Sequence, residues 1–189
     1  MSVLQPGLFD APPAGPEGLV YRPALIGPAE ERALVARIAG LPLKPFEFHG
    51  YLGKRRVTYF GWRYDHNGAG LGPAAAIPDW LLPLREAVAG FAGLAPERLV
   101  QALVTEYEPG AGIGWHRDRP QFGEVIGVSL LAPCLFRLRR RRDGGFERAA
   151  FVAEPRSAYL MQGAARTEWE HSIPAVEVLR YSVTFRTLR

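Results

Sequence analysis

Two residues near the middle of the chain, His116 and Asp118, stand two positions apart in the segment TEYEPGAGIGWHRDRP (residues 105–120). On an extended chain, residues i and i+2 share a face, so this imidazole and this carboxylate can bind the same ion. A second imidazole comes from His171 in the segment EWEHSIP. Two histidines and one carboxylate can hold a divalent metal while leaving several coordination positions open. We therefore predict a metal site at His116, Asp118 and His171.

A second set of polar residues lies on the last predicted strand, RYSVTFR (residues 180–186). Alternate residues of a strand share a face, so Arg180, Ser182, Thr184 and Arg186 lie together, opposite three core residues. The two arginines are roughly 20 Å apart along the backbone, too far to hold one carboxylate together. Long side chains that lean inward can hold the two ends of a small dicarboxylate, because guanidinium groups bind carboxylates through charge-assisted bonds. Neither arginine is expected to bind the metal.

The order His-x-Asp, His, Arg-x5-Arg indicates a non-haem Fe(II) oxygenase, whose metal has open positions for cosubstrates. A hydrolytic zinc site can be built from the same three ligands. Hydrolysis, however, gives no reason for the arginine pair, so we favour the oxygenase.

The elements that must position these residues are short strands in the second half of the chain. From Val100 onward, runs such as VQALVTEY, VIGVSLLA, LFRLR, AAFVAE and SAYLM alternate with Gly, Pro and Asp turns. About seven such strands predict a β-sandwich or barrel. Two helices are predicted earlier, within residues 27–40 and 77–93, with Pro83 as a kink or a start of the second. They are expected to support one side of the sheet.

The composition is that of one globular domain, because the chain has 189 residues and 48% of them are hydrophobic. Residues 1–18, rich in Pro, Gly and Ala, are predicted to be a flexible tail, and residues 19–189 a single domain. The longest uncharged apolar run, VIGVSLLAPCLF, has 12 residues and is too short to span a bilayer. With no signal-peptide pattern and with Cys134 as the only cysteine, we expect a cytoplasmic monomer without membrane contact or disulfides.

The basic residues are concentrated in RLRRRRDGG (residues 137–145), where five arginines precede an Asp-Gly-Gly turn. The net charge of +4 permits an anionic partner. We interpret the run either as a phosphate-binding surface or as the solvated tip of a β-hairpin.

Three segments together resemble the AlkB-like family of 2-oxoglutarate and Fe(II)-dependent dioxygenases: TEYEPGAGIGWHRD, EHSIP and RYSVTFR. The resemblance extends from about residue 20 to the end of the chain. It implies a mainly β (α+β) fold with a double-stranded β-helix, or jelly-roll, core and the two helices as support. It also implies Fe(II), 2-oxoglutarate and O2 as cofactors, with iron at His116, Asp118 and His171. The 2-oxoglutarate site that it implies consists of Thr105, Tyr107, Arg180, Ser182 and Arg186.

The resemblance further implies oxidative demethylation of alkylated DNA or RNA bases. The segment KRRVTYFGWRYDHNG (residues 54–68) resembles the family's substrate lid, and its mixture of arginines and aromatic residues suits the stacking of a flipped base. The candidates for substrate contact are Arg56, Tyr59, Trp62 and Tyr64.

Two residues depart from the family pattern close to the site. Thr105 replaces an asparagine and keeps a hydrogen-bonding oxygen, so cosubstrate binding is expected to survive. Pro120 stands where DNA-repairing members carry an acidic residue, and it offers no polar side chain. This departure leaves the same chemistry on a protein, lipid or small molecule as an alternative. A non-enzymatic nucleic-acid-binding module with a degenerate metal site is a further alternative.

The tail contains QPGLF, Gln5 to Phe9. This pattern resembles the peptides that bind bacterial sliding clamps, which makes a clamp a candidate partner. We expect the motif to be dispensable for catalysis.

Overall fold

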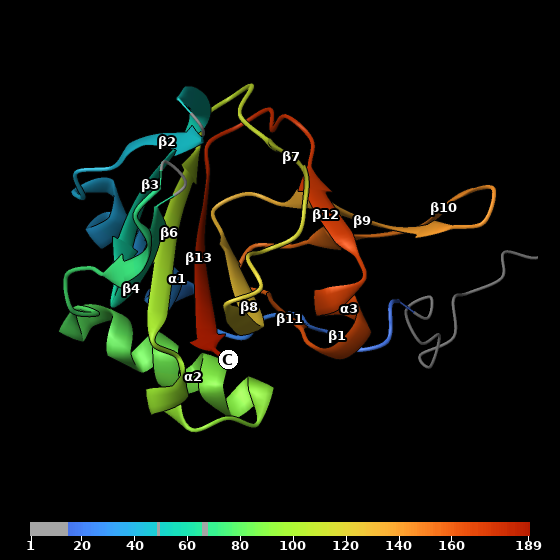
Figure 1. The fold of residues 1–189 in the computed structure, drawn as a ribbon. Helices are drawn as coiled ribbons and strands as arrows, with labels where there is room; N and C mark the ends of the chain where they lie inside the picture. The colour runs from blue at the N-terminus through green and yellow to red at the C-terminus, as the bar shows by residue number, and fades with distance from the viewer. Residues whose placement is uncertain (1–14, 49, 66–67) are drawn as a thin grey trace, which may run out of the picture.

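Two antiparallel sheets face each other, and helices cover the outer side of the larger one (Figure 1). This computed structural model describes residues 15–48, 50–65 and 68–189. The larger sheet has seven strands, which in spatial order are β1 (Leu19–Arg22), β11 (Ala158–Met161), β8 (Phe122–Leu130), β13 (Arg180–Leu188), β6 (Gln101–Tyr107), β3 (Tyr51–Phe60) and β2 (Lys44–Phe48).

Four strands form the smaller sheet, in the order β10 (Gly145–Ala153), β9 (Cys134–Arg142), β12 (Glu170–Ile173) and β7 (Ile113–His116). A separate hairpin pairs β4 (Trp62–Asp65) with β5 (Gly70–Pro73). The two facing sheets have the jelly-roll arrangement that the sequence predicts. The strands β1 to β5 precede Val100 and were not predicted.

Both predicted helices are present. The first, α1 (Pro28–Ala39), has a proline in its first turn and acidic residues at its N-terminal end, where they suit the helix dipole. The second begins with a 3-10 turn, η1 (Asp79–Leu81), and continues as α2 (Leu82–Ala92), so Pro83 lies in the first turn and does not kink the helix. Two short elements, η2 (Pro96–Arg98) and α3 (Gly163–Thr167), were not predicted.

The larger sheet separates two hydrophobic cores. Leu34 and Leu84 from the helices pack with Val183 and Phe185 of β13 in the first core. The second core lies between the sheets and is rich in aromatic residues, among them Phe136. Because strand residues alternate, β13 sends its apolar residues into the first core and its polar residues toward the smaller sheet.

The chain enters the larger sheet through β1, and the residues before it contact the segment around α3. The backbone N–H of Gln162 donates to the carbonyl of Gly18 (3.0 Å), and that of Ala165 donates to Glu17 (2.8 Å). The predicted clamp-binding motif, Gln5 to Phe9, lies outside the described residues, as does most of the predicted tail. Among the described helices, none has the length and apolar character needed to cross a membrane.

Candidate active site

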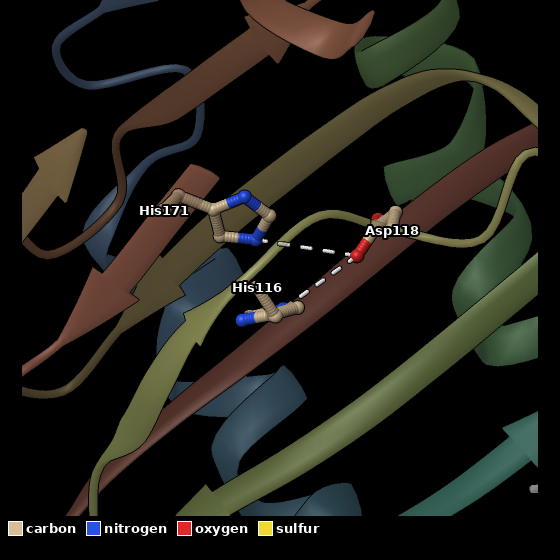
Figure 2. Close-up of side chains that lie close together, drawn as sticks. All are labelled: His116, Asp118 and His171. Carbon is tan, nitrogen blue, oxygen red and sulfur yellow. Dashed lines mark ion pairs between the residues drawn. The ribbon is translucent and has the colours of Figure 1, made fainter. Parts of the chain in front are cut away.

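The three predicted metal ligands come together between the two sheets (Figure 2). Their ligand atoms all lie within 4.8 Å of one another. The Nε2 atoms of His116 and His171 are 3.7 Å and 4.0 Å from Oδ1 of Asp118. One carboxylate oxygen therefore faces both imidazoles, which is the donor set that suits a divalent transition metal.

Strand pairing explains why the two histidines meet. His116 ends β7 and lies opposite His171 in the antiparallel ladder with β12. Gly112, just before β7, allows the close approach of the chain that follows β12, since a Cβ there would lie 2.7 Å from the carbonyl oxygen of Ile173. Asp118 follows β7 and turns back toward the histidine pair.

The two oxygens of Asp118 have different partners. Oδ2 accepts a hydrogen bond of 2.8 Å from Nε of Arg186, and Oδ1 faces the histidines. The carboxylate is buried, which alone would raise its pKa, but Arg186 and the two histidines reverse the effect and hold its pKa well below the ordinary value. Asp118 is therefore ionised, and its orientation is set by Arg186.

Both histidines are neutral at physiological pH. Burial, together with the repulsion that a protonated His116 would exert, lowers the pKa of His171 to about 3. Burial also lowers the pKa of His116. A neutral imidazole offers the lone pair that a metal needs, so the pair is ready to bind without losing protons.

A cavity of about 110 Å³ adjoins the three ligands. Hydroxyl-bearing residues of β6 and β13 line one wall. They are Thr105, Tyr107, Ser182 and Thr184, with Arg186 at the end of the row. Ser182 lies opposite Thr105 in the pairing of β13 with β6. Three of the four polar residues of β13, namely Ser182, Thr184 and Arg186, therefore line the cavity as strand alternation predicts, whereas Arg180 is not among the lining residues.

Arg180, one of the two arginines predicted to bind 2-oxoglutarate, is completely buried. Its Nη2 donates to Oγ of Ser129 at 3.1 Å, and its guanidinium lies 5.0 Å from the ring centre of Tyr107. Among the described residues, Nε and Nη1 of Arg180 have no hydrogen-bond partner. A buried guanidinium with two free donors is costly unless a ligand satisfies it. A carboxylate is the ligand that fits, as the predicted dicarboxylate requires.

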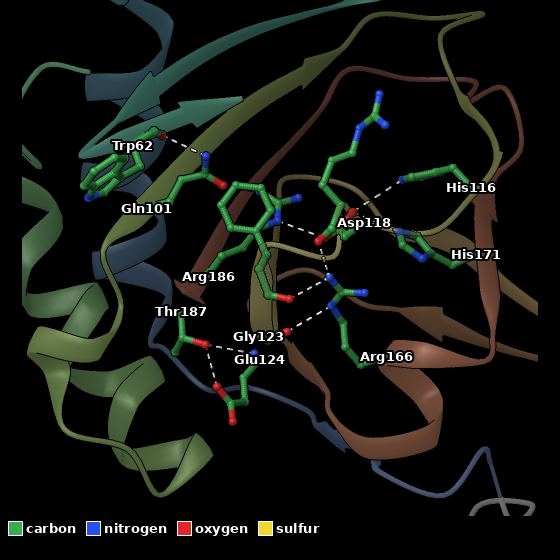
Figure 3. Close-up of polar contacts among 12 residues, drawn as sticks. Trp62, Gln101, His116, Asp118, Gly123, Glu124, Arg166, His171, Arg186 and Thr187 are labelled. Atoms are coloured by element: carbon green, nitrogen blue, oxygen red, sulfur yellow. Dashed lines mark hydrogen bonds and ion pairs between the residues drawn. The ribbon is translucent and has the colours of Figure 1, made fainter. Parts of the chain in front are cut away.

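Arg186 lies closer to the metal ligands than the sequence indicates. Besides its bond to Asp118, its Nη1 donates to Oε1 of Gln101 at 2.9 Å, and Gln101 in turn donates to the carbonyl of Trp62 at 2.7 Å (Figure 3). Arg186 is not one of the three candidate ligands, as predicted, but it contacts one of them, which the sequence did not indicate. It orients a metal ligand, and this contact depends on side-chain reach that strand alternation does not reveal.

The loop after Asp118 is held by Arg166, a residue that sequence reasoning missed. From α3, its guanidinium donates to the carbonyls of Arg119 (2.6 Å), Phe122 (2.8 Å) and Gly123 (2.9 Å). These bonds join the segment that precedes His171 to the loop that follows Asp118 (Figure 3). No motif marks this arginine, because its partners are backbone atoms.

The predicted substrate residues divide into two groups. Tyr59 and Tyr64 line the cavity beside the metal ligands and also a neighbouring cavity of about 510 Å³. Trp62 lines neither cavity and contributes only its backbone carbonyl to Gln101. Pro120 is exposed and lies outside the lining of both cavities.

Two adjacent arginines lie on β3, and the prediction that Arg56 contacts the substrate chose the one that faces away from the cavities. Arg56 forms an ion pair of 2.6 Å with Glu106, away from both cavities, whereas its neighbour Arg55 lines the smaller cavity. Burial lowers the pKa of Arg55. The prediction failed because both faces of β3 carry an arginine, so the sequence does not show which face is turned inward.

Comparison with known proteins gives one family. The sequence profile of the 2OG-Fe(II) oxygenase superfamily matches residues 24–186. The "Alkylated DNA repair protein ALKBH8 homolog" of Arabidopsis thaliana is 27% identical over 183 residues, which cover 83% of this chain and 51% of the relative. The "Probable RNA/DNA demethylase ALKBH6" of Danio rerio is 31% identical over 117 residues, covering 62% of this chain and 46% of the relative. The chain therefore spans about half the length of these two curated relatives.

Solved structures share the fold. OsALKBH1 matches with a TM-score of 0.70 at 16% identity, covering 92% of this chain and 98% of that chain. A prolyl-4-hydroxylase from Pseudomonas putida matches with a TM-score of 0.59 at 16% identity, covering 91% of this chain and 93% of that chain. The jelly-roll prediction is confirmed, and the family match and the relatives confirm the resemblance of the chain to AlkB-like 2-oxoglutarate and Fe(II)-dependent dioxygenases.

Proposed function

Because the chain belongs to the 2OG-Fe(II) oxygenase superfamily, we propose that it removes alkyl groups oxidatively from nucleic acid bases. The observation that carries this proposal is the position of Tyr59 and Tyr64. Both line the cavity at the metal ligands and the larger cavity beside it. A flipped base is held by stacking on such aromatic rings while its alkyl group faces the reactive centre. The printed names of the two ALKBH relatives support the same substrate class.

The residues of the site fit both the metal and the cosubstrate. His116, Asp118 and His171 would hold Fe(II), as their shared carboxylate oxygen and neutral imidazoles indicate. Arg180 would hold a carboxylate of 2-oxoglutarate through its free donors, with the ring of Tyr107 beside it. Bound together, iron and 2-oxoglutarate supply the oxidation of a C–H bond by O2, with succinate and carbon dioxide as coproducts.

The protein itself contributes position and charge. Arg186 fixes the carboxylate of Asp118 so that one oxygen is left for the metal. Phe136 and Met161 give the cavity apolar walls that limit access of water. The tyrosine rings at the boundary of the two cavities would stack on the base, so that its N-alkyl group would be turned toward the side of the cavity lined by His116, Asp118 and His171. When the group is N-methyl, hydroxylation of its carbon gives N–CH2OH, which breaks its C–N bond to release formaldehyde and leave the N–H of the unmodified base.

Succinate and formaldehyde release test the proposal directly. Purified protein with Fe(II), 2-oxoglutarate and O2 is supplied with single-stranded DNA or RNA oligonucleotides, each carrying one methylated base. We expect formaldehyde in proportion to succinate with at least one of them, and none with the unmethylated oligonucleotide. His171→Ala is the inactive control. Succinate release that no methylated base stimulates would contradict the nucleic acid substrate and leave the oxygenase chemistry standing.

Pro120 favours a second candidate, the same chemistry on a protein, lipid or small molecule. Its exposed ring offers no polar group to a base at the position where DNA-repairing members read one. The succinate assay separates the candidates when peptides, lipids and small amines replace the oligonucleotides. Stimulation by one of these compounds, and by no methylated base, is the result that this second candidate predicts.

A further inference from the structure

The arginine run of the sequence forms one arm of a long β-hairpin. Strands β9 and β10 pair from Cys134 opposite Ala153 to Arg142 opposite Gly145. The turn is Asp143 and Gly144, and Gly144 has a φ of 83°, which favours glycine. Both strands belong to the smaller sheet, and the tip of the hairpin projects beyond β12 (Figure 1). The prediction of a hairpin tip at the Asp-Gly-Gly turn is confirmed.

This hairpin carries the net positive charge of the whole protein. Residues 134–153 contain six arginines and two acidic residues, and therefore a net charge of +4. The complete chain also has a net charge of +4, so the remaining residues sum to zero. Charge concentrated in this way attracts an anionic partner to one place on the surface.

Two arginines of the hairpin are neutralised by neighbouring carboxylates. Arg140 forms ion pairs with Glu147 (2.8 Å) and Glu168 (2.5 Å), and Arg142 pairs with Glu147 (3.0 Å). Arg140 shares its strand face with the core residue Leu138, so these pairs lie along the inner side of the hairpin.

On the outer face of the smaller sheet, positive side chains are not matched by negative ones. Arg137, Arg139, Arg141 and Arg148 share this side by strand alternation, and we call them the arginine face. Arg139 pairs with Glu170 at 2.6 Å. Within the described part of the chain, no carboxylate lies within ion-pair distance of the other three.

Aromatic side chains support the guanidinium groups of this face. The guanidiniums of Arg137 and Arg139 lie 5.0 Å and 4.4 Å from the ring centre of Trp115. Those of Arg139 and Arg148 lie 4.5 Å and 5.8 Å from the ring centre of Phe146. A guanidinium beside an aromatic ring is held in place and keeps N–H donors for phosphate oxygens. The arginine face is therefore partly ordered before any ligand binds.

The arginine face is connected to the active site through β7. This strand lies at the edge of the smaller sheet, in the order β10-β9-β12-β7. Trp115 belongs to the arginine side of β7, and the next residue, His116, faces the cavity. A flexible chain bound on the outer face can therefore pass around the β7 edge and place one residue in the cavity.

We propose that the arginine face binds the sugar-phosphate backbone of the nucleic acid strand whose modified base enters the cavity. The inference deepens the proposed function and rests on it for the identity of the strand. Arginines spaced along one strand face, three of the four without an ion pair in the described part of the chain, match the repeated charges of a phosphodiester backbone. The contacts are to phosphates, so they raise affinity without selecting a sequence.

The test uses an unmethylated, fluorescein-labelled single-stranded 20-mer and the metal-free full-length protein, with binding followed by fluorescence anisotropy at several salt concentrations. The test variant is Arg141→Gln with Arg148→Gln, whose exposed side chains form no ion pair within the described structure. The matched control is Arg32→Gln with Arg37→Gln, two exposed arginines of α1 on the opposite side of the larger sheet.

We expect the test variant to bind at least about tenfold more weakly at low salt, with a logarithmic salt slope reduced by about 1.4, because two phosphate contacts are lost. The control variant, which loses the same charge, should bind like the wild type. Equal weakening in both variants would overturn the proposal, because net charge alone would then explain binding. Unchanged oligonucleotide binding with lost binding to vesicles of anionic lipid would also overturn it, in favour of a membrane surface.

The binding experiment tests the arginine face separately from the demethylase activity. If the test variant loses oligonucleotide binding but no methylated base is ever turned over, the arginine face stands and the demethylase proposal falls. If methylated bases are turned over while both variants bind equally, the demethylase proposal stands and the arginine face falls.

Discussion

Asp118 links the residues of the site more closely than any other side chain. One of its oxygens faces both histidines and the other accepts the bond from Arg186. The order of the motifs in the sequence and their resemblance to the AlkB-like family pointed to these three residues, which the structure brings together. Strand alternation does not explain the position of Asp118, which follows the end of β7 and turns back toward the histidines. The sequence did not indicate the contact of Arg186, whose long side chain reaches a metal ligand. Nor could it choose Arg55 over Arg56, since that choice depends on how β3 is turned.

Arg180→Lys should weaken 2-oxoglutarate binding while leaving metal affinity unchanged. An ammonium group cannot reproduce the planar donors of a guanidinium, and partial loss of a buried charge-assisted pair costs on the order of 1.5 to 3 kcal/mol. That corresponds to roughly tenfold to hundredfold weaker binding. Calorimetric titration with 2-oxoglutarate, and Co(II) titration for the metal site, measure the two affinities.

The Arg186→Lys variant should be compared with Arg180→Lys for its affinities for 2-oxoglutarate and for Co(II). Arg186 contacts Asp118 directly, so its replacement should weaken Co(II) binding as well as 2-oxoglutarate binding. If Arg180→Lys and Arg186→Lys lost metal affinity equally, the proposal that only Arg186 orients a metal ligand would be wrong.

At the scale of elements, the loop after Asp118 depends on the short helix before His171. Helix α3 presents Arg166 to three carbonyls of this loop. No pattern in the sequence indicates α3, because its five residues are too few to show a helical periodicity. Likewise β4 and β5 escaped prediction, since they form a separate two-stranded hairpin. The long elements β8, β13 and α1 were predictable from their patterns of apolar residues.

Arg166→Gln should lower the affinity of the metal site about tenfold, because supporting residues of a metal site typically contribute tenfold to a hundredfold. The loss of three bonds frees the loop that carries Asp118. Co(II) titration monitored by absorbance provides the measurement. Arg85→Gln is the control, because Arg85 makes a similar bond to the carbonyl of Pro96 in the helical layer. A metal affinity equal in the two variants would show that the loop is positioned without Arg166.

At the scale of the whole molecule, the larger sheet isolates the site from the helices. The helix-side core contains no residue of the metal site, which lies between the two sheets. The two-layer β architecture and both supporting helices were predicted from the sequence. The order of the strands was not, because long-range pairing depends on the packing of the whole chain.

Leu84→Ala should destabilise the fold without changing the site. Leu84 is buried in the helix-side core, and replacing a buried leucine by alanine costs about 2 to 5 kcal/mol through lost burial and the cavity left behind. Urea unfolding measures this loss, and 2-oxoglutarate affinity at low temperature should match the wild type. A stable variant with weakened 2-oxoglutarate binding would show that the two sides of the sheet are coupled.

His116, Asp118 and His171 would hold iron beside a 2-oxoglutarate site that includes Arg180. Anaerobic addition of Fe(II) and 2-oxoglutarate, followed by visible absorption, tests it most directly, because chelation of the iron by 2-oxoglutarate produces a charge-transfer band. We predict the band in the wild-type protein, its absence in His171→Ala and Asp118→Ala, and its recovery at raised 2-oxoglutarate concentration in Arg180→Lys. A wild-type protein that binds Fe(II) without the band, or a His171→Ala variant that retains it at full intensity, would contradict the account.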